Sequence, residues 1–483
     1  MMSALRFGTS GWRAVTGDEF TTANVRLVSR AIAEYVRASV PHAPAGEPPT
    51  VLVGYDTRFL SERFARTAAD ALAAAGVRPL LCAEPTPTPA VALQVLRRKI
   101  AGAVTITASH NPPEYNGVKF TPSWGGPALP ETTRAIEARI DALVDADARE
   151  ESRREVPPPP AVPGAATLID ARPEYLDQLA RLVDLDAVRR ARPSLVLDPL
   201  YGATRGYLDA IAGRAGARFT VLHAWRDAYF GGRSPDPSAD GLRELRTAVA
   251  EGDAVLGLAT DGDGDRFGVV DEDGAFVSPN VVLPLLLDYL ARTRGWRGGA
   301  VARSAATTHL IDAVAAEHGL AVHETPVGFK YIGELLSRDT AVFGGEESAG
   351  LSIAGHVPDK DGVLACLLVA EMVSRTGAGL AELTAALFRR VGPRYSARAD
   401  FAVTDAVAAR VAALLADPPA LVAGLRVRDV SRLDGCKLLL ENGAWLLVRP
   451  SGTEPVVRCY GEAPTPELLD ALMAAARRLL LGG

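Results

Sequence analysis

Three successive stretches of this chain alternate between short apolar segments and amphipathic helical patterns, and this alternation strongly limits the folds open to it. Segments such as PTVLVGYD, SLVLDP and GAVARS have the character of buried strands, whereas SERFARTAADALAAAG and HLIDAVAAEHG have helical spacing. Alternating units of this kind predict mostly parallel sheets covered by helices. Because 483 residues exceed what one hydrophobic core usually organises, we expect several domains.

The clearest boundary is ESRREVPPPPAVPG (151–164), where a charge run and several prolines support neither a helix nor a buried strand. We therefore expect α/β domains over 1–155, 165–271 and 272–392, all with one topology and mixed sheets. The last stretch, 393–483, surrounds two helical runs with alternating segments and predicts a smaller α+β domain. The predicted fold class is α/β.

Composition and charge exclude several classes of protein. Hydrophobic residues make up 48% and charged residues 23%, as in soluble globular chains. A net charge of −6 disfavours general nucleic-acid binding, which needs a basic face. No apolar run is long enough to span a bilayer and the first residues lack a signal-peptide core, so we expect a cytoplasmic protein without a membrane partner. Reduced thiols are expected for the scattered cysteines Cys82, Cys366, Cys436 and Cys459.

A polar loop follows the strand-like AVTIT and contains Ser109, His110 and Lys119 within TASHNPPEYNGVKF (107–120). Ligands of α/β sheets collect outside the carboxyl ends of strands, so this placement favours a role in binding or catalysis. A hydrolase-type serine would need GxSxG, which Ser109 lacks. An ordinary polar turn before Asn-Pro is the alternative interpretation.

The sequence DGDGDR (261–266) places Asp261, Asp263 and Asp265 at alternate positions, separated by glycines that let the backbone curl around an ion. Carboxylate oxygens suit a hard cation such as Mg²⁺. A Ca²⁺ loop is the rival interpretation, but its sixth position needs glycine and here holds Arg266. The flanking segments also have strand and hairpin patterns instead of helical ones, so we favour Mg²⁺ over a calcium-binding module.

Two further loops carry polar groups. GGEESAG (344–350) presents carboxylates and a hydroxyl suited to vicinal hydroxyl groups, although exposed surface glutamates would give the same pattern. PDKDG (358–362) holds Lys360, either a surface lysine or an acid/base group. RPSGTEP (449–455) combines a guanidinium, two hydroxyls and a flexible glycine, which is a cradle for a phosphate without a Walker A loop.

Taken together and in this order, these motifs resemble the α-D-phosphohexomutase superfamily over essentially the whole chain. FGTSGWR (7–13) matches the N-terminal signature of that family. The resemblance implies a heart-shaped protein of four domains around a central cleft. It also implies an isomerase of carbohydrate metabolism that interconverts hexose 1-phosphate and hexose 6-phosphate through a phosphoserine and a 1,6-bisphosphate intermediate.

The resemblance further implies roles for individual residues. Ser109 would carry the phosphoryl group and, with the three aspartates of DGDGDR, bind Mg²⁺. Arg13, Arg266 and Lys119 would neutralise phosphoryl charge, and His110, Lys119 and Lys360 are the candidate bases. The substrate-binding residues implied are Gly328, Glu346, Ser348, Arg449, Ser451, Gly452, Thr453 and Arg458. Glucose 1,6-bisphosphate would act as activator and intermediate, and the protein would be a monomer or a homodimer.

The segment VGFKYIGELL (327–336) and the sugar loop look most like the phosphoglucomutase branch, so glucose phosphates are the expected substrates. Ala349 departs from relatives with a histidine in this loop, which favours Lys360 as the proton carrier. Glucose and mannose share the 3- and 4-hydroxyls that Glu346 and Ser348 are expected to bind, so phosphomannomutase or dual activity is the main alternative. Phosphoglucosamine mutase activity, or an inactive scaffold, is a weaker alternative.

Overall fold

The computed structural model describes residues 5–7, 11–39, 47–151, 166–452 and 455–482. The chain forms two compact units. Unit 1 comprises Met1–Val277, Leu336–Arg338 and Ala349–Gly377, and unit 2 comprises Ser278–Leu335, Asp339–Ser348 and Ala378–Gly483.

The first sheet of unit 1 has the strand order β1-β5-β4-β2-β3-β6. Its strands are β1 (Trp12–Val15), β2 (Thr50–Tyr55), β3 (Arg78–Cys82), β4 (Gly102–Ile106), β5 (Tyr115–Pro122) and β6 (Thr167–Ile169). Strands β4, β2, β3 and β6 are parallel, whereas β5 runs antiparallel to both β4 and β1. Strand β6 follows the proline-rich segment in sequence and still belongs to this first sheet.

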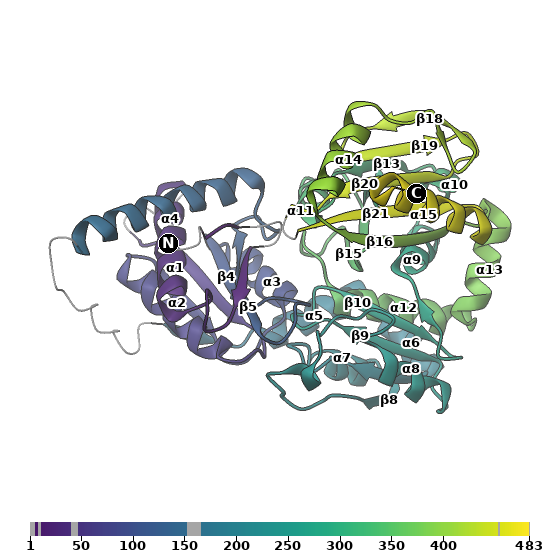
Figure 1. The fold of residues 1–483 in the computed structure, drawn as a ribbon. Helices are drawn as coiled ribbons and strands as arrows, with labels where there is room; N and C mark the ends of the chain where they lie inside the picture. The colour runs from purple at the N-terminus through teal and green to yellow at the C-terminus, as the bar shows by residue number, and fades with distance from the viewer. Residues whose placement is uncertain (1–4, 8–10, 40–46, 152–165, 453–454, 483) are drawn as a thin grey trace. The chain divides into compact units, whose positions relative to one another are not determined.

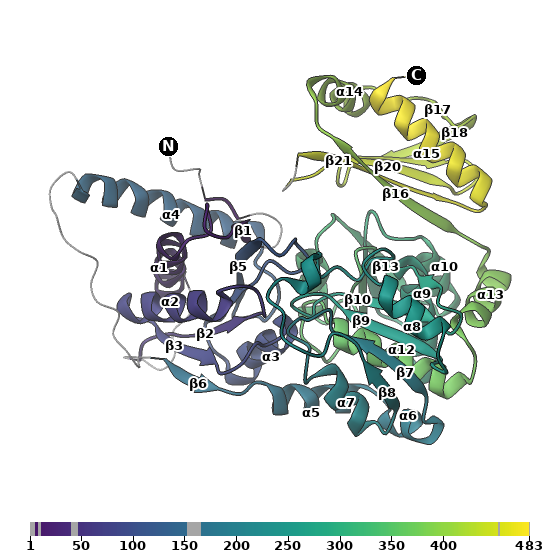
Figure 2. The ribbon, with the colours of Figure 1, turned by 60° about the horizontal axis from the view of Figure 1, so that its bottom comes forward.

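Helices cover this first sheet because their apolar stripes have nowhere else to bury. They are α1 (Thr22–Ser39), α2 (Ser61–Ala74), α3 (Thr88–Arg98) and α4 (Pro130–Glu151). Helix α2 lies against the central strands and packs on α1, which in turn contacts α4, as Figures 1 and 2 show. Helix α3 packs on β2, β4 and β5.

The second sheet of unit 1 has the order β11-β10-β9-β7-β8. Its strands are β7 (Ser194–Asp198), β8 (Arg218–Val221), β9 (Leu256–Thr260), β10 (Phe267–Asp271) and β11 (Phe276–Val277). Strands β8, β7 and β9 are parallel, and β9 and β10 form an antiparallel hairpin. The associated helices are α5 (Arg172–Leu182), α6 (Leu185–Ala191), α7 (Leu208–Arg214), α8 (Arg243–Ala250) and α12 (Gly362–Thr376). Strand β15 (Gly350–Ile353) also lies in unit 1.

In unit 2, the parallel strands β12 (Ala300–Ser304), β13 (Ala321–Thr325) and β14 (Phe343–Glu346) follow the order β13-β12-β14. Helices α9 (Pro279–Thr293), α10 (Leu310–Glu317), α11 (Phe329–Ser337) and α13 (Leu380–Val391) accompany them. A buried cluster that includes Ala305, Ala306, Trp445 and Leu447 joins this sheet to the C-terminal sheet within the unit.

The C-terminal sheet is antiparallel, in the order β16-β21-β20-β19-β18-β17. Its strands are β16 (Tyr395–Ala402), β17 (Leu421–Val422), β18 (Leu425–Ser431), β19 (Cys436–Leu440), β20 (Trp445–Pro450) and β21 (Val456–Ala463). Helices α14 (Asp405–Ala416) and α15 (Pro466–Leu481) pack on one another, and α15 covers β16 and β21. The predicted fold class is therefore confirmed: α/β sheets followed by an α+β part.

Within the described residues, no single helix is long and apolar enough to cross a membrane. Among these residues, the consecutive helices α12 and α13 reach the required length and apolar character only when they are taken together.

Candidate active site

Ser109 lies in the loop between β4 and β5, buried to 1% exposure, with a left-handed backbone at φ 53°. This conformation is costly for a non-glycine residue, so the surroundings must hold it in place. The Ser109 backbone N–H donates to Thr107 Oγ1 at 2.8 Å. Its side-chain Oγ donates to Asp261 Oδ2 at 2.6 Å and lies 3.3 Å from His110 Nδ1.

The buried guanidinium of Arg58 holds the Ser109 loop in place through hydrogen bonds. Its two terminal nitrogens donate to the backbone carbonyls of Ser109, Asn111, Pro112 and Tyr115, at 2.6 to 3.0 Å. Its Nε lies 3.2 Å from Asp56 Oδ2, which also accepts a hydrogen bond from Thr107. Because Arg58 is fully buried, the loop conformation depends on a cation that lies out of contact with solvent.

The metal-binding candidate is the loop between β9 and β10, and these strand flanks agree with the sequence-based argument against an EF-hand. Asp261, Asp263 and Asp265 are all buried, and each offers an oxygen within 4.8 Å of those of the others. Burial and the neighbouring charges of Asp263 and Asp265 raise the pKa of Asp261 well above its ordinary value. Three adjacent carboxylates of this kind favour a bound cation.

Two of the aspartate oxygens show whether this loop could bind a metal ion. Among the described side chains, Asp263 Oδ1 and Asp265 Oδ1 are buried without any hydrogen-bond partner. Their other oxygens are occupied, because Lys119 Nζ lies 2.6 Å from Asp263 Oδ2 and 2.9 Å from Asp265 Oδ2. Buried polar atoms are normally paired, so these two orphaned oxygens fit the ligand set of a divalent cation.

Glycines let the serine loop and the metal loop approach closely. A methyl group on Gly262 would lie 2.6 Å from the Ser109 carbonyl oxygen, a distance that no real Cβ tolerates. Thr88, the first residue of α3, holds the metal loop in place. Its Oγ1 donates to Asp263 Oδ2 at 2.6 Å, and its N–H donates to the Asp263 carbonyl. The loops are therefore locked together through backbone contacts as well as side chains.

Lys119 and Lys360 both reach the metal loop. Lys360 Nζ lies 3.2 Å from Asp265 Oδ2. Although burial opposes the effect, Asp263 and Asp265 raise the pKa of Lys119 above its ordinary value, so this lysine stays charged. A small cavity of about 30 Å³ is bordered by Lys119, Lys360, Asp265 and Asp359, among others. Burial raises the pKa of Asp359 to about 6.

The two residues that follow Lys360 hold its segment in place. Asp361 caps α12 by accepting from the Leu364 N–H at 2.9 Å and also accepts from the Tyr175 hydroxyl at 2.8 Å. The Gly362 N–H donates to the Gly264 carbonyl at 3.0 Å, which ties the start of α12 to the metal loop. Lys360 is thus held beside the aspartates by its neighbours in sequence.

The remaining predicted residues of unit 1 also gather here. Arg13, on β1, donates to Asn111 Oδ1 in the serine loop. Arg266 donates its N–H to Asp261 Oδ1 at 3.0 Å, and its guanidinium lies 3.8 Å from Asp236. Burial and the charge of Arg266 lower the pKa of His110 well below its ordinary value, so its imidazole is neutral. The structure therefore brings all the unit 1 candidates together.

The other predicted residues lie in unit 2. Glu346 is the last residue of β14 and is 4% exposed, and its Oε1 accepts from the Gly328 N–H at 2.7 Å. Gly328 has φ 128°, a backbone conformation open only to glycine. The direction of its N–H toward Glu346 therefore depends on a residue without a side chain. Glu347 accepts from Ser304 Oγ at 2.8 Å, which anchors the loop, and Ser348 is half-buried.

The predicted phosphate cradle lies where β20 and β21 meet. Arg449 and Arg458 face each other across these two strands, and like charges in such positions repel. The Arg449 Nε lies 2.7 Å from Asp434 Oδ2, and the Arg458 Nε lies 3.8 Å from Asp400 Oδ2. Ser451 and Gly452 follow Arg449, whereas Thr453 falls outside the described residues. Paired guanidinium groups of this kind suit an anionic ligand.

Models of the phosphoglucomutase/phosphomannomutase family match four parts of the chain: α/β/α domain I over residues 4–146, domain II over 173–274, domain III over 278–391 and the C-terminal domain over 400–479. A phosphoglucomutase of Komagataeibacter xylinus is 32% identical, and the alignment covers 95% of this chain and 87% of that protein. This chain belongs to the α-D-phosphohexomutase superfamily.

Other relatives share the fold but carry different substrate names. A protein of Pyrococcus abyssi described as a probable phosphoglucosamine mutase is 32% identical, over 98% of this chain and 97% of its own. A crystal structure from Thermus thermophilus, whose description names a phosphomannomutase, has 34% identity and a TM-score of 0.84 over 99% of both chains. The chain is thus a phosphohexomutase, an isomerase that transfers a phosphoryl group, and these relatives leave its sugar open.

Sequence reasoning missed several residues that shape this phosphohexomutase site. Arg58, Thr88 and Asp361 hold the reactive loops, yet none lies in a motif that points to chemistry. Arg58 sits in YDTRFLSERF, where it is one of three arginine or glutamate residues at a helix start and looks exposed. The four carbonyls that it binds lie 51 or more residues further along the chain, so only the folded structure identifies this role.

Proposed function

We propose that this phosphohexomutase interconverts glucose 1-phosphate and glucose 6-phosphate through a phosphorylated Ser109 and glucose 1,6-bisphosphate. The observation that carries the proposal is the buried Ser109 Oγ, held 2.6 Å from Asp261 in a triad of buried aspartates. A hydroxyl in this position is next to a donor set that fits a divalent cation. It is therefore the group best placed to carry a phosphoryl group.

The three aspartates would hold Mg²⁺ together with the phosphorylated serine. When bound, this ion supplies positive charge against the equatorial oxygens of the transferring phosphoryl group. The chain adds fixed cations of its own at the same place. Arg13 reaches the serine loop from β1, Lys119 lies between two aspartates, and Arg266 lies at the end of the metal loop. Their role is to position the phosphoryl group and balance its charge, which is most of what phosphoryl transfer requires.

Lys360 is the proposed proton carrier for the attacking sugar hydroxyl. Lys119 is poorly suited because two carboxylates hold its proton. His110 contacts the Ser109 Oγ itself, so its geometry suits orienting the serine rather than meeting the sugar. A Lys360→Met variant should lose kcat far more than a His110→Gln variant. The opposite ranking would transfer the role to His110.

Recognition of the sugar and of the distal phosphate is proposed for residues of unit 2. Glu346, fixed by Gly328, and Ser348 would bind the 3- and 4-hydroxyls. Arg449, Ser451 and Gly452, with Arg458 opposite, would grip the phosphate that does not react. Glucose and mannose share these hydroxyls, so the mannose phosphates are the second candidate substrates.

A coupled assay decides the sugar. Glucose 1-phosphate, mannose 1-phosphate and glucosamine 1-phosphate are each supplied with Mg²⁺ and a trace of the matching 1,6-bisphosphate, and kcat/KM is compared. The proposal expects glucose 1-phosphate to rank first and glucosamine 1-phosphate last. A preference for mannose or glucosamine would replace the proposed substrate without changing the reaction class.

The covalent step is tested separately. Ser109→Ala should abolish turnover and incorporation of phosphate from labelled glucose 1,6-bisphosphate, while the far-ultraviolet circular dichroism spectrum stays unchanged. Ser123→Ala is the matched control, because Ser123 is an exposed residue just beyond β5. Retained turnover in Ser109→Ala would contradict the phosphoserine mechanism.

A further inference from the structure

The carboxylate of Asp434 connects two parts of unit 2 that carry different proposed tasks. Asp434 lies in the turn between β18 and β19, and its side chain is 21% exposed. Its Oδ2 accepts from the Arg449 Nε at 2.7 Å and from the Val327 backbone N–H at 2.9 Å. A single oxygen thus holds both the phosphate-cradle arginine and the loop between β13 and α11.

The contact continues directly to the sugar loop. Val327 donates to Asp434, and the next residue, Gly328, donates to Glu346 Oε1 at 2.7 Å. Two consecutive N–H groups therefore donate to two different carboxylates. Arg449 and Glu346 are separated by 103 residues in sequence, yet only Asp434 and this dipeptide lie between them in the hydrogen-bonded chain.

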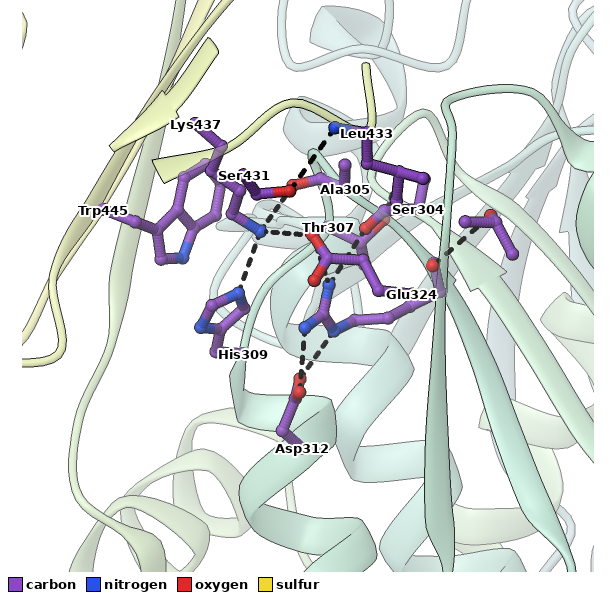
Figure 3. A network of polar contacts seen from close by, with 12 residues as sticks. Ser304, Ala305, Thr307, His309, Asp312, Glu324, Ser431, Leu433, Lys437 and Trp445 are labelled. Atoms are coloured by element: carbon purple, nitrogen blue, oxygen red, sulfur yellow. Dashed lines mark hydrogen bonds and ion pairs between the residues drawn. The ribbon is translucent and has the colours of Figure 1, made fainter. Parts of the chain in front are cut away.

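The turn that carries Asp434 is anchored, so this connection is built into the fold. Lys437, three residues further on, is 2% exposed and donates to the Ala305 carbonyl and to Glu324 Oε1, both at 2.8 Å (Figure 3). Its ammonium also lies 2.9 Å from His309 Nε2 and 4.5 Å from the centre of the Trp445 ring. Such a buried and fully engaged lysine fixes the start of β19 against the β12 and β13 sheet.

A carboxylate at this position has an electrostatic reason as well. Arg449 faces Arg458 across the hairpin, and two adjacent guanidinium groups repel unless anions offset them. Asp434 engages Arg449 through its Nε, and a guanidinium also carries four N–H bonds on its terminal nitrogens, the edge that binds phosphate in bidentate fashion. Asp434 can therefore orient Arg449 toward an anion without competing for that edge.

We propose that Asp434 is a positioning residue that sets the placement of Arg449 relative to Glu346, and so couples the grip on the distal phosphate to the reading of the sugar hydroxyls. This inference rests on the proposed roles of Arg449 and Glu346. A hexose phosphate whose distal phosphate binds Arg449 then finds Glu346 already in position for its hydroxyl groups. Loss of Asp434 uncouples the two contacts without removing either.

A double-mutant cycle on kcat/KM for the preferred hexose 1-phosphate tests the coupling. The variants are Asp434→Asn, Glu346→Gln and the double variant. Asp434→Asn alone should lower kcat/KM roughly tenfold, about the size of one charge-assisted hydrogen bond, mainly through a higher KM. In the Glu346→Gln background the same substitution should cost less than about threefold, because the partner contact is already gone.

Two further variants separate positioning from folding. Asp429→Asn is the matched control, since Asp429 is an exposed aspartate on β18, and it should leave kcat/KM unchanged. Asp434→Glu keeps the charge on a longer side chain and should recover part of the loss. Thermal unfolding of each variant shows whether the fold is intact, and Asp434→Glu carries the test if Asp434→Asn unfolds.

The outcomes distinguish a failure of the Asp434 coupling from a failure of the proposed function. Equal losses in both backgrounds, or no loss in Asp434→Asn, would overturn the coupling while the proposed function stands. A wild-type protein inactive with all three hexose 1-phosphates would overturn the proposed function and this inference together. A smaller loss in the Glu346→Gln background, with Asp429→Asn unaffected, supports the coupling.

Discussion

Replacement of Arg58 by lysine tests whether the guanidinium, and not only a positive charge, holds the Ser109 loop. Arg58 donates to four backbone carbonyls from two terminal nitrogens, in a fork that spans the loop. A lysine ammonium places its three donors at one point and cannot reach all four carbonyls. We take two hydrogen bonds as lost, each worth roughly 1.5–3 kcal/mol because the donor is charged and buried.

The loss of two hydrogen bonds reduces the free energy that stabilises the observed loop conformation by roughly 3–6 kcal/mol. That conformation already carries the left-handed backbone of Ser109, which costs about 1–2 kcal/mol. The loop therefore relaxes, and the reactive geometry becomes a minor state. Because each 1.4 kcal/mol is tenfold in rate, a loss of about 3 kcal/mol predicts a fall in kcat of at least about two orders of magnitude.

The assay measures kcat together with the rate at which the protein incorporates phosphate from labelled glucose 1,6-bisphosphate, the step that the proposed mechanism assigns to Ser109. Arg63→Lys is the matched control, because Arg63 is an exposed arginine in the first turn of α2. Urea unfolding identifies any variant that fails to fold. A variant Arg58→Lys that keeps kcat and the phosphorylation rate within about threefold of wild type would refute the reasoning, whatever its stability.

Three other predictions follow from the site and its surroundings. Chelation should abolish turnover, and added Mg²⁺ should raise the unfolding temperature of the wild type but not of a variant with Asp261→Asn, measured by calorimetry. Gly262→Ala should destabilise the protein by about 1–3 kcal/mol in urea unfolding, since its methyl group meets the Ser109 carbonyl, whereas Gly213→Ala, with no heavy atom nearer than 3.8 Å, should not. Although burial opposes it, the hydrogen bond to Asp198 raises the pKa of His223, so its stabilisation over His223→Gln should be full below about pH 6.5 and fade as the pH rises through the folded pKa.

The repeated alternation of strands and helices made the fold predictable, because burial of apolar faces decides it locally. The helical pattern in SERFARTAADALAAAG is α2 (Ser61–Ala74), and the strand before the serine loop is β4 (Gly102–Ile106). The acidic loop was predictable because its three aspartates occupy alternate positions in one short segment. Its strand flanks, β9 and β10, are the feature that set aside a calcium loop.

What the sequence could not predict depends on contacts between distant residues. Arg58 and Asp434 each lie in segments without a recognisable motif. Arg58 binds the Ser109 carbonyl 51 residues further on, and Asp434 joins Arg449 to Val327, which lies 107 residues before it. A polar residue in a local pattern looks the same whether it is buried with a distant partner or solvated. Thr88 is missed for the same reason, since a threonine at a helix start is ordinary and only the fold brings it to Asp263.

Strand β6 makes the first α/β sheet dependent on chain that comes after the proline-rich segment. Thr167–Ile169 pairs with β3 along its outer edge. A fragment that stops at residue 155 would leave that edge of β3 unpaired, and unpaired edges recruit strands from other molecules. Excision of this sheet for separate study should therefore end beyond Ile169, and a protease cut within 152–165 should leave the two pieces associated through β6.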